Sequence, residues 1–118
     1  MKKKVIILGS TGSIGTKTFN IFKKDNNNFD VLLLSTYSNV DKIVKQAKEL
    51  KVKNIIINNT EKYKEAKIKY AKQDFKIYNN FSDIKKIIGK QKIYYSMISV
   101  SGLDGLEPTL ILPKYSLP

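Results

Sequence analysis

The chain has 118 residues, with 22 basic and ten acidic side chains and a formal net charge of +12. It contains no cysteine and no histidine, which excludes disulfides, thiol nucleophiles, imidazole acid–base chemistry and Cys/His metal sites within these residues. This length suits one domain, or part of one, with a modest hydrophobic core.

The basic excess does not by itself indicate a nucleic-acid partner. Every basic residue is lysine, so the bidentate contacts that arginine makes with bases and phosphates are missing. Scattered solvated lysines are the simpler interpretation, although the positive field would attract phosphorylated ligands weakly. No apolar run approaches the ~20 residues that span a bilayer, and the N-terminal run is too short for a secretory signal. We therefore expect a cytoplasmic protein with no nucleic-acid and no membrane partner.

The apolar residues 5–8 lead directly into the sequence Gly-Ser-Thr-Gly-Ser-Ile-Gly at residues 9–15. A helical pattern follows, marked by Ile14, Thr18, Ile21 and Phe22. A buried strand, a glycine turn and a helix in this order are typical of loops that bind phosphate at a helix N-terminus. The glycines allow a tight turn, and the hydroxyls of Thr11 and Ser13 could donate to a pyrophosphate. The alternative is a helix start in a fold that binds no ligand.

Residues 31–34 predict a second strand that is buried on both faces, and a polar loop at residues 35–39 follows it. In NAD sites an acidic residue about 20 positions beyond the glycine turn usually binds the ribose 2′-hydroxyl. This loop has no acid, and Tyr37, Ser38 and Asn39 could instead donate to a 2′-phosphate. The loop therefore favours NADP over NAD, although Asn39 also suits a helix N-cap in an ordinary turn.

Helices and strands alternate along the rest of the chain. The pattern predicts helices at residues 40–50, 60–72 and 82–88, and strands at residues 54–57, 76–78 and 93–100. Ser82 is expected to cap the third of these helices, and Gly89 to end it. A glycine-containing loop at residues 101–105 precedes a helix that would begin near Pro108. This alternation predicts the α/β class, with a Rossmann-like, doubly wound parallel sheet.

Ligands of such a sheet bind at the carboxyl ends of its strands, where the strand order reverses. Asp104 and Glu107 are the carboxylates nearest to this expected cleft. One interpretation is that these two carboxylates form an acid–base pair. Because Glu107 precedes Pro108, the better interpretation is that it stabilises the first turn of a helix.

Three motifs carry a resemblance to a known family. They are K-V-I-I-L-G-S-T-G-S-I-G-T at residues 4–16, V-L-L-L-S with S-N-V between residues 31 and 40, and G-L-D-G-L-E-P-T-L at residues 102–110. In this order and spacing, residues 2–110 resemble the N-terminal part of 1-deoxy-D-xylulose-5-phosphate reductoisomerases. The resemblance implies an NADPH-binding Rossmann-like domain with cofactor contacts at Thr11, Gly12, Ser13, Ile14, Tyr37, Ser38 and Asn39. Many members carry glycine and then lysine or arginine at the positions of Tyr37 and Ser38, so this chain lacks one expected charge-assisted contact.

The resemblance also implies an activity for the full-length family. Those enzymes isomerise and reduce 1-deoxy-D-xylulose 5-phosphate to 2-C-methyl-D-erythritol 4-phosphate in non-mevalonate isoprenoid precursor synthesis. They use NADPH and Mg²⁺ or Mn²⁺, bind the phosphorylated sugar in a further domain, and generally form homodimers. Here the match stops at Leu110, before the family's Leu-Ala-Asn-Lys-Glu segment and its acidic metal ligands. We therefore expect residues 1–118 to be an incomplete NADPH-binding domain from a truncated, frameshifted or fragmentary copy, without catalytic or metal-binding residues and inactive alone.

Other functions remain compatible with the residues. One is the cofactor domain of another NADP-dependent reductase, such as a semialdehyde or short-chain dehydrogenase. The Tyr-x-x-x-Lys spacing of short-chain dehydrogenases occurs at Tyr63 and Lys67, but too early in the chain for that role. A non-catalytic dinucleotide sensor is the main alternative from another class, and a basic nucleic-acid module is the last.

Overall fold

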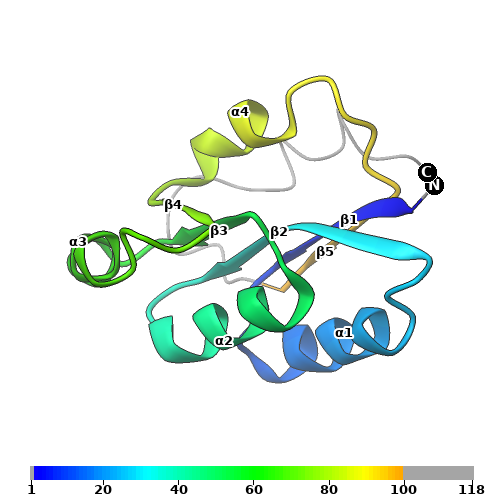
Figure 1. Ribbon diagram of the computed structural model, residues 1–118, viewed down its shortest axis with the longest axis horizontal. Helices are drawn as coiled ribbons and strands as arrows, with labels where there is room; N and C mark the ends of the chain where they lie inside the picture. The colour runs from blue at the N-terminus through cyan, green and yellow to red at the C-terminus, as the bar shows by residue number, and fades with distance from the viewer. Residues whose placement is uncertain (1, 100–118) are drawn as a thin grey trace.

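The structure, a computed structural model, describes residues 2–99. Within them, five strands form one sheet, and helices cover both of its faces (Figure 1). The strands are β1 (Lys3–Leu8), β2 (Phe29–Thr36), β3 (Asn54–Ile57), β4 (Lys76–Tyr78) and β5 (Tyr95–Ile98). The helices are α1 (Ser13–Lys24), α2 (Val40–Leu50), α3 (Thr60–Lys69) and α4 (Ile84–Ile88), with a 3₁₀ turn at Phe81–Asp83. The loop at residues 101–105, the helix near Pro108, and Asp104 and Glu107 lie outside the described residues.

The strand order is β4-β3-β2-β1-β5, and each neighbouring pair is parallel. The chain steps from β1 outward to β4 and then returns, so that β5 pairs with the other side of β1. The strand order thus reverses between β1 and β5, and the carboxyl ends of the strands share one edge of the sheet. This topology confirms the predicted α/β, Rossmann-like fold, and it marks that edge as the place where ligands bind in such sheets.

Two hydrophobic clusters lie on opposite faces of the sheet. Along β1, Val5 and Ile7 belong to the cluster covered by α1 and α2, whereas Ile6 and Leu8 belong to the cluster covered by α4. Figure 1 shows these helices on opposite sides of the strands. Because side chains alternate across a strand, a strand with a helical layer on each face needs apolar residues at every position. This explains the uninterrupted apolar run of β1.

A bulge in β2 changes the pairing between β1 and β2. Val5 lies opposite Val31, but Ile6 lies opposite Leu33, so Leu32 is an extra residue in β2. As a result, Val31 and Leu34 face the same cluster although they are three positions apart. The bulge therefore sets which side chains face which layer at the carboxyl end of β2.

Some local expectations need correction. Ile14 and Ile21 lie on the exposed side of α1, with 59% and 63% of their surface accessible, because Phe19 and Phe22 occupy the positions that face the sheet. The polar loop predicted at residues 35–39 begins later, since Ser35 and Thr36 are buried residues of β2. The helix predicted at residues 82–88 starts as the 3₁₀ turn, and no capping hydrogen bond from the Ser82 side chain is present among the described residues.

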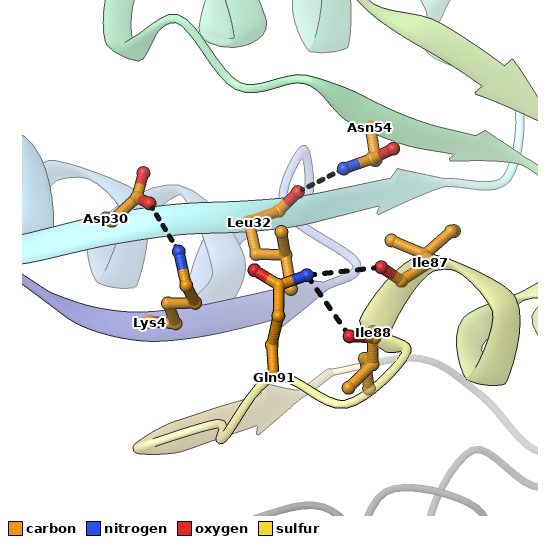
Figure 2. A network of polar contacts seen from close by, with 7 residues as sticks. All are labelled: Lys4, Asp30, Leu32, Asn54, Ile87, Ile88 and Gln91. Carbon is orange, nitrogen blue, oxygen red and sulfur yellow. Dashed lines mark hydrogen bonds and ion pairs between the residues drawn. The ribbon is translucent and has the colours of Figure 1, made fainter.

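Polar contacts join neighbouring elements at the opposite end of the strands (Figure 2). Lys4 Nζ lies 3.1 Å from Asp30 Oδ2 across β1 and β2, a half-buried surface pair of the kind that contributes at most about 1 kcal/mol. Asn54 Nδ2 donates to the Leu32 carbonyl at 3.1 Å. Gln91 Nε2 donates at 3.1 Å to the Ile88 carbonyl, an end carbonyl of α4 that also accepts the Gln91 backbone N–H at 3.0 Å.

Candidate dinucleotide site at the carboxyl end of the sheet

The glycine loop turns the chain sharply between the end of β1 at Leu8 and the start of α1 at Ser13. Gly9 has φ +81°, in the left-handed region that glycine adopts without strain. The Gly12 N–H donates to the Gly9 carbonyl at 3.3 Å and closes the turn, and the Thr16 N–H donates to the Gly12 carbonyl at 2.8 Å. The predicted strand, glycine turn and helix are therefore all present, and α1 begins at the carboxyl edge of the sheet.

The glycines at positions 12 and 15 differ in the space around them. A Cβ at Gly15 would lie 1.9 Å from the Gly9 carbonyl oxygen and 2.7 Å from its carbon, because α1 packs directly against the loop. A Cβ at Gly12 would have its nearest neighbour at 3.7 Å, which is ordinary contact. Packing thus requires glycine at position 15 but not at position 12, where the residue is exposed.

The N-terminus of α1 is open to a ligand within the described structure. None of the hydrogen bonds described for residues 2–99 uses the backbone N–H of Ser13 or Ile14. Gly12 is the N-cap without a side-chain cap, and the first turn of α1 has no acidic residue. Unpaired N–H groups and the positive end of the helix dipole favour an anion at such a position.

A buried polar network, which the sequence analysis missed, holds the glycine loop against β2 and α2. Ser10 Oγ donates to Gln46 Oε1 at 2.8 Å, and Gln46 Nε2 donates back to the Ser10 carbonyl at 2.9 Å. Ser35 accepts the Gly9 N–H on its Oγ and the Ser10 N–H on its carbonyl, both at 2.9 Å. Ser10, Ser35 and Gln46 are almost completely buried. The sequence signal that could have revealed this network is Gln46 itself, a glutamine three positions after Ile43 on the buried side of α2.

The two predicted loops lie against each other. Thr11 Oγ1 lies 2.7 Å from Thr36 Oγ1, which also accepts the Asn39 N–H at 3.2 Å. Asn39 is the N-cap of α2, as predicted, because its side chain accepts the Lys42 N–H at 3.3 Å. Thr11 and Asn39 are therefore brought together through Thr36.

The other predicted contact residues lie at the surface around this junction. Gly12, Ser13, Ile14, Tyr37 and Ser38 are all exposed, and Tyr37 has 56% of its surface accessible. No side-chain hydrogen bond of Tyr37 or Ser38 occurs among the described residues, so both hydroxyls are available to a ligand.

One cation that the sequence analysis did not single out reaches this site. Lys42, in the first turn of α2, donates from Nζ to the Thr11 carbonyl at 3.0 Å.

At the far edge of the sheet, burial and then the Asp83 carboxylate raise the pKa of Tyr78. Among residues 2–99, no group of three or more Asp or Glu side chains is arranged to hold a metal ion. That same part of the chain contains no helix with the length and apolar character needed to cross a membrane.

We predict that Gln46→Leu lowers the free energy of unfolding by about 1–2 kcal/mol, because it removes two buried hydrogen bonds at nearly constant volume. The Ser10 Oγ would keep only its longer contact of 3.3 Å with the Ser35 carbonyl, and the Ser10 carbonyl would keep only the contact of 3.3 Å from Thr16 Oγ1. Urea unfolding measures the change. Gln73→Leu, at an exposed glutamine, is the matched control, and equal stability of the two variants would contradict a supporting role for the network.

The sequence matches the family model for 1-deoxy-D-xylulose 5-phosphate reductoisomerase over residues 5–113. A curated relative from Pelagibacter ubique (strain HTCC1062), which bears that name, is 41% identical over 122 residues. The alignment includes 97% of this chain but only 30% of the relative. The chain thus spans less than a third of the length of this relative.

Solved structures with the same fold come from similarly named proteins. The 1-deoxy-D-xylulose 5-phosphate reductoisomerase of Zymomonas mobilis in complex with NADPH superposes with a TM-score of 0.80 at 24% identity, over 93% of this chain and 29% of that one. A DOX-P reductoisomerase in complex with NADPH, fosmidomycin and magnesium gives a TM-score of 0.77 at 27% identity, over 92% and 27%. Both superpositions include nearly all of this chain and less than a third of the other protein.

Proposed function

Because the chain belongs to the 1-deoxy-D-xylulose 5-phosphate reductoisomerase family, we propose that residues 1–118 form the NADPH-binding part of such an enzyme. The observation that carries the proposal is the open N-terminus of α1, held beside an acid-free end of β2. A dinucleotide with a 2′-phosphate has two anionic groups that suit these positions, the pyrophosphate for the N-terminus of α1 and the 2′-phosphate for the end of β2. Two of the similar solved structures are complexes with NADPH.

We assign the pyrophosphate to the first loop. Thr11, Gly12, Ser13 and Ile14 surround the first turn of α1, where the unpaired N–H groups of Ser13 and Ile14 meet the positive end of the helix dipole. The Ser13 hydroxyl adds a donor. Gly12 allows close approach, because it places no side chain between these groups and the ligand.

We assign the 2′-phosphate of the adenosine ribose to the second loop. Tyr37 and Ser38 offer exposed hydroxyl donors, and the Asn39 amide can donate while its oxygen caps α2. A carboxylate at this position would repel a 2′-phosphate, and the loop has none. The assignment therefore predicts stronger binding of NADPH than of NADH.

The chemistry of the whole enzyme requires more than these residues. The name of the relatives indicates a phosphorylated sugar as substrate, and three of the similar structures contain magnesium. Residues 2–99 contain no cluster of carboxylates arranged for a metal ion. We propose that the rest of a full-length enzyme binds metal and substrate, and that this chain supplies NADPH as the hydride donor without turning over substrate itself.

Titration of the 118-residue chain with NADPH and with NADH tests the proposed function. NADPH should raise the unfolding temperature more than NADH does, with about 2.7 kcal/mol of stabilisation at a ligand concentration one hundred times the dissociation constant. Isothermal titration calorimetry supplies both dissociation constants, and circular dichroism shows that the chain is folded. Stronger binding of NADH would contradict the assignment of the second loop. A folded chain that binds neither cofactor would contradict the proposed function.

A further inference from the structure

Lys42 connects the two loops of the proposed cofactor site. Its backbone N–H donates to the Asn39 side chain in the second loop, and its Nζ donates to the Thr11 carbonyl in the first loop at 3.0 Å. The side chain is half-buried and lines a groove of about 420 Å³ between α1 and α2, together with Asn39 and Lys45. The ammonium group is therefore held at the junction where the adenosine end of the cofactor is assigned.

The charge of Lys42 is not neutralised within the described residues. The ion pairs described for residues 2–99 join Lys4 with Asp30, Lys23 with Glu49 and Lys62 with Glu65. Glu49 and Asp41 also line the groove, but Glu49 is paired and Asp41 is exposed to water, which weakens its field.

The ammonium group also has donors to spare. An ammonium has three N–H donors, and the contact with the Thr11 carbonyl uses one of them. Within the described structure Lys42 thus offers a positive charge and two further donors to an anion.

We propose that Lys42 recognises the 2′-phosphate of NADPH and thereby sets the preference for NADPH over NADH. The proposal rests on the proposed function and adds a charged contact to a loop whose own donors, on Tyr37 and Ser38, are neutral. A charge-assisted hydrogen bond to phosphate is roughly twice as strong as a neutral one, so neutral hydroxyls alone would discriminate weakly. NADH has no 2′-phosphate and would gain little from this side chain.

Calorimetric titration of Lys42→Met and Lys42→Arg with NADPH and NADH tests this role. We expect Lys42→Met to weaken NADPH about tenfold and NADH less than about twofold, and Lys42→Arg to retain the preference. A matched lysine gives the comparison. Lys62 occupies the equivalent place behind the Asn59 cap of α3. Lys62→Met should leave the ratio of the two dissociation constants unchanged.

Three results would overturn the role of Lys42 while leaving the proposed function intact. Equal weakening of NADPH and NADH by Lys42→Met would assign the lysine to support of the Thr11 carbonyl. Unchanged binding of both cofactors would remove it from the site. A loss of preference in Lys62→Met but not in Lys42→Met would transfer recognition of the phosphate to α3. If the folded unsubstituted chain bound no NADPH, both proposals would be rejected together.

Discussion

Gly15→Ala is expected to lower the free energy of unfolding by at least about 3 kcal/mol, at or above the upper end of the usual cost of overpacking. The added Cβ would lie 1.9 Å from the Gly9 carbonyl oxygen and 2.8 Å from the Ser10 Cα. These atoms are backbone, so no side-chain rotation relieves the clash, and α1 must move away from the loop. Since small domains are stable by only about 5–15 kcal/mol, such a loss would remove a large part of the free energy of unfolding.

Gly12→Ala is the matched control for this prediction. Gly12 has φ −75°, which alanine adopts readily, and the space around its Cβ is open. Its cost should stay below about 1 kcal/mol, the difference between glycine and alanine as N-cap residues. Urea unfolding of both variants measures the contrast. Similar stability of the two would show that α1 can shift on the loop at little cost.

The sequence predicts the sheet well because its signals are local. Each central strand is a short apolar run bounded by polar residues or glycine, and the bounds expected at residues 54–57 and 76–78 agree with β3 and β4. The Asn39 cap was also predictable, because it depends on residues three positions apart. The side of α1 that faces the sheet was not predictable from the sequence. Isoleucine and phenylalanine are both strongly apolar, so composition does not show which of them faces the sheet. In the structure Gly15 packs closely against Gly9, and the buried side of α1 that includes it carries Phe19 and Phe22.

The candidate site is harder to derive, because its supports join distant parts of the chain. The Ser10 and Gln46 side chains are 36 positions apart, and Lys42 is 31 positions from the carbonyl that it contacts. Ser35 looked like a loop residue because its type is polar, yet it is a buried residue of β2 that binds the glycine turn. Sequence patterns locate the two loops. They do not show which polar side chains hold those loops together.

Gly12→Ala should also separate binding of the cofactor from folding. The protein is expected to stay folded, whereas NADPH and NADH should both bind at least about tenfold more weakly. The reason is the position of the new methyl group, next to the free N–H groups of Ser13 and Ile14 that we assign to the pyrophosphate. The pyrophosphate is common to both cofactors, so their ratio should not change. That pattern differs from the selective loss expected for Lys42→Met.

Calorimetric titration of folded Gly12→Ala with both cofactors measures this loss, and Ser82→Ala, at an exposed position on the 3₁₀ turn, is the control for an unrelated substitution. A folded variant with unchanged affinity would show that the phosphates do not approach Gly12, and the assignment of the first loop would then be wrong. If affinity falls for both cofactors here and for NADPH alone in Lys42→Met, the two loops act on different phosphates. Gly15 would then maintain the turn, Gly12 would admit the pyrophosphate, and Lys42 would distinguish the two cofactors.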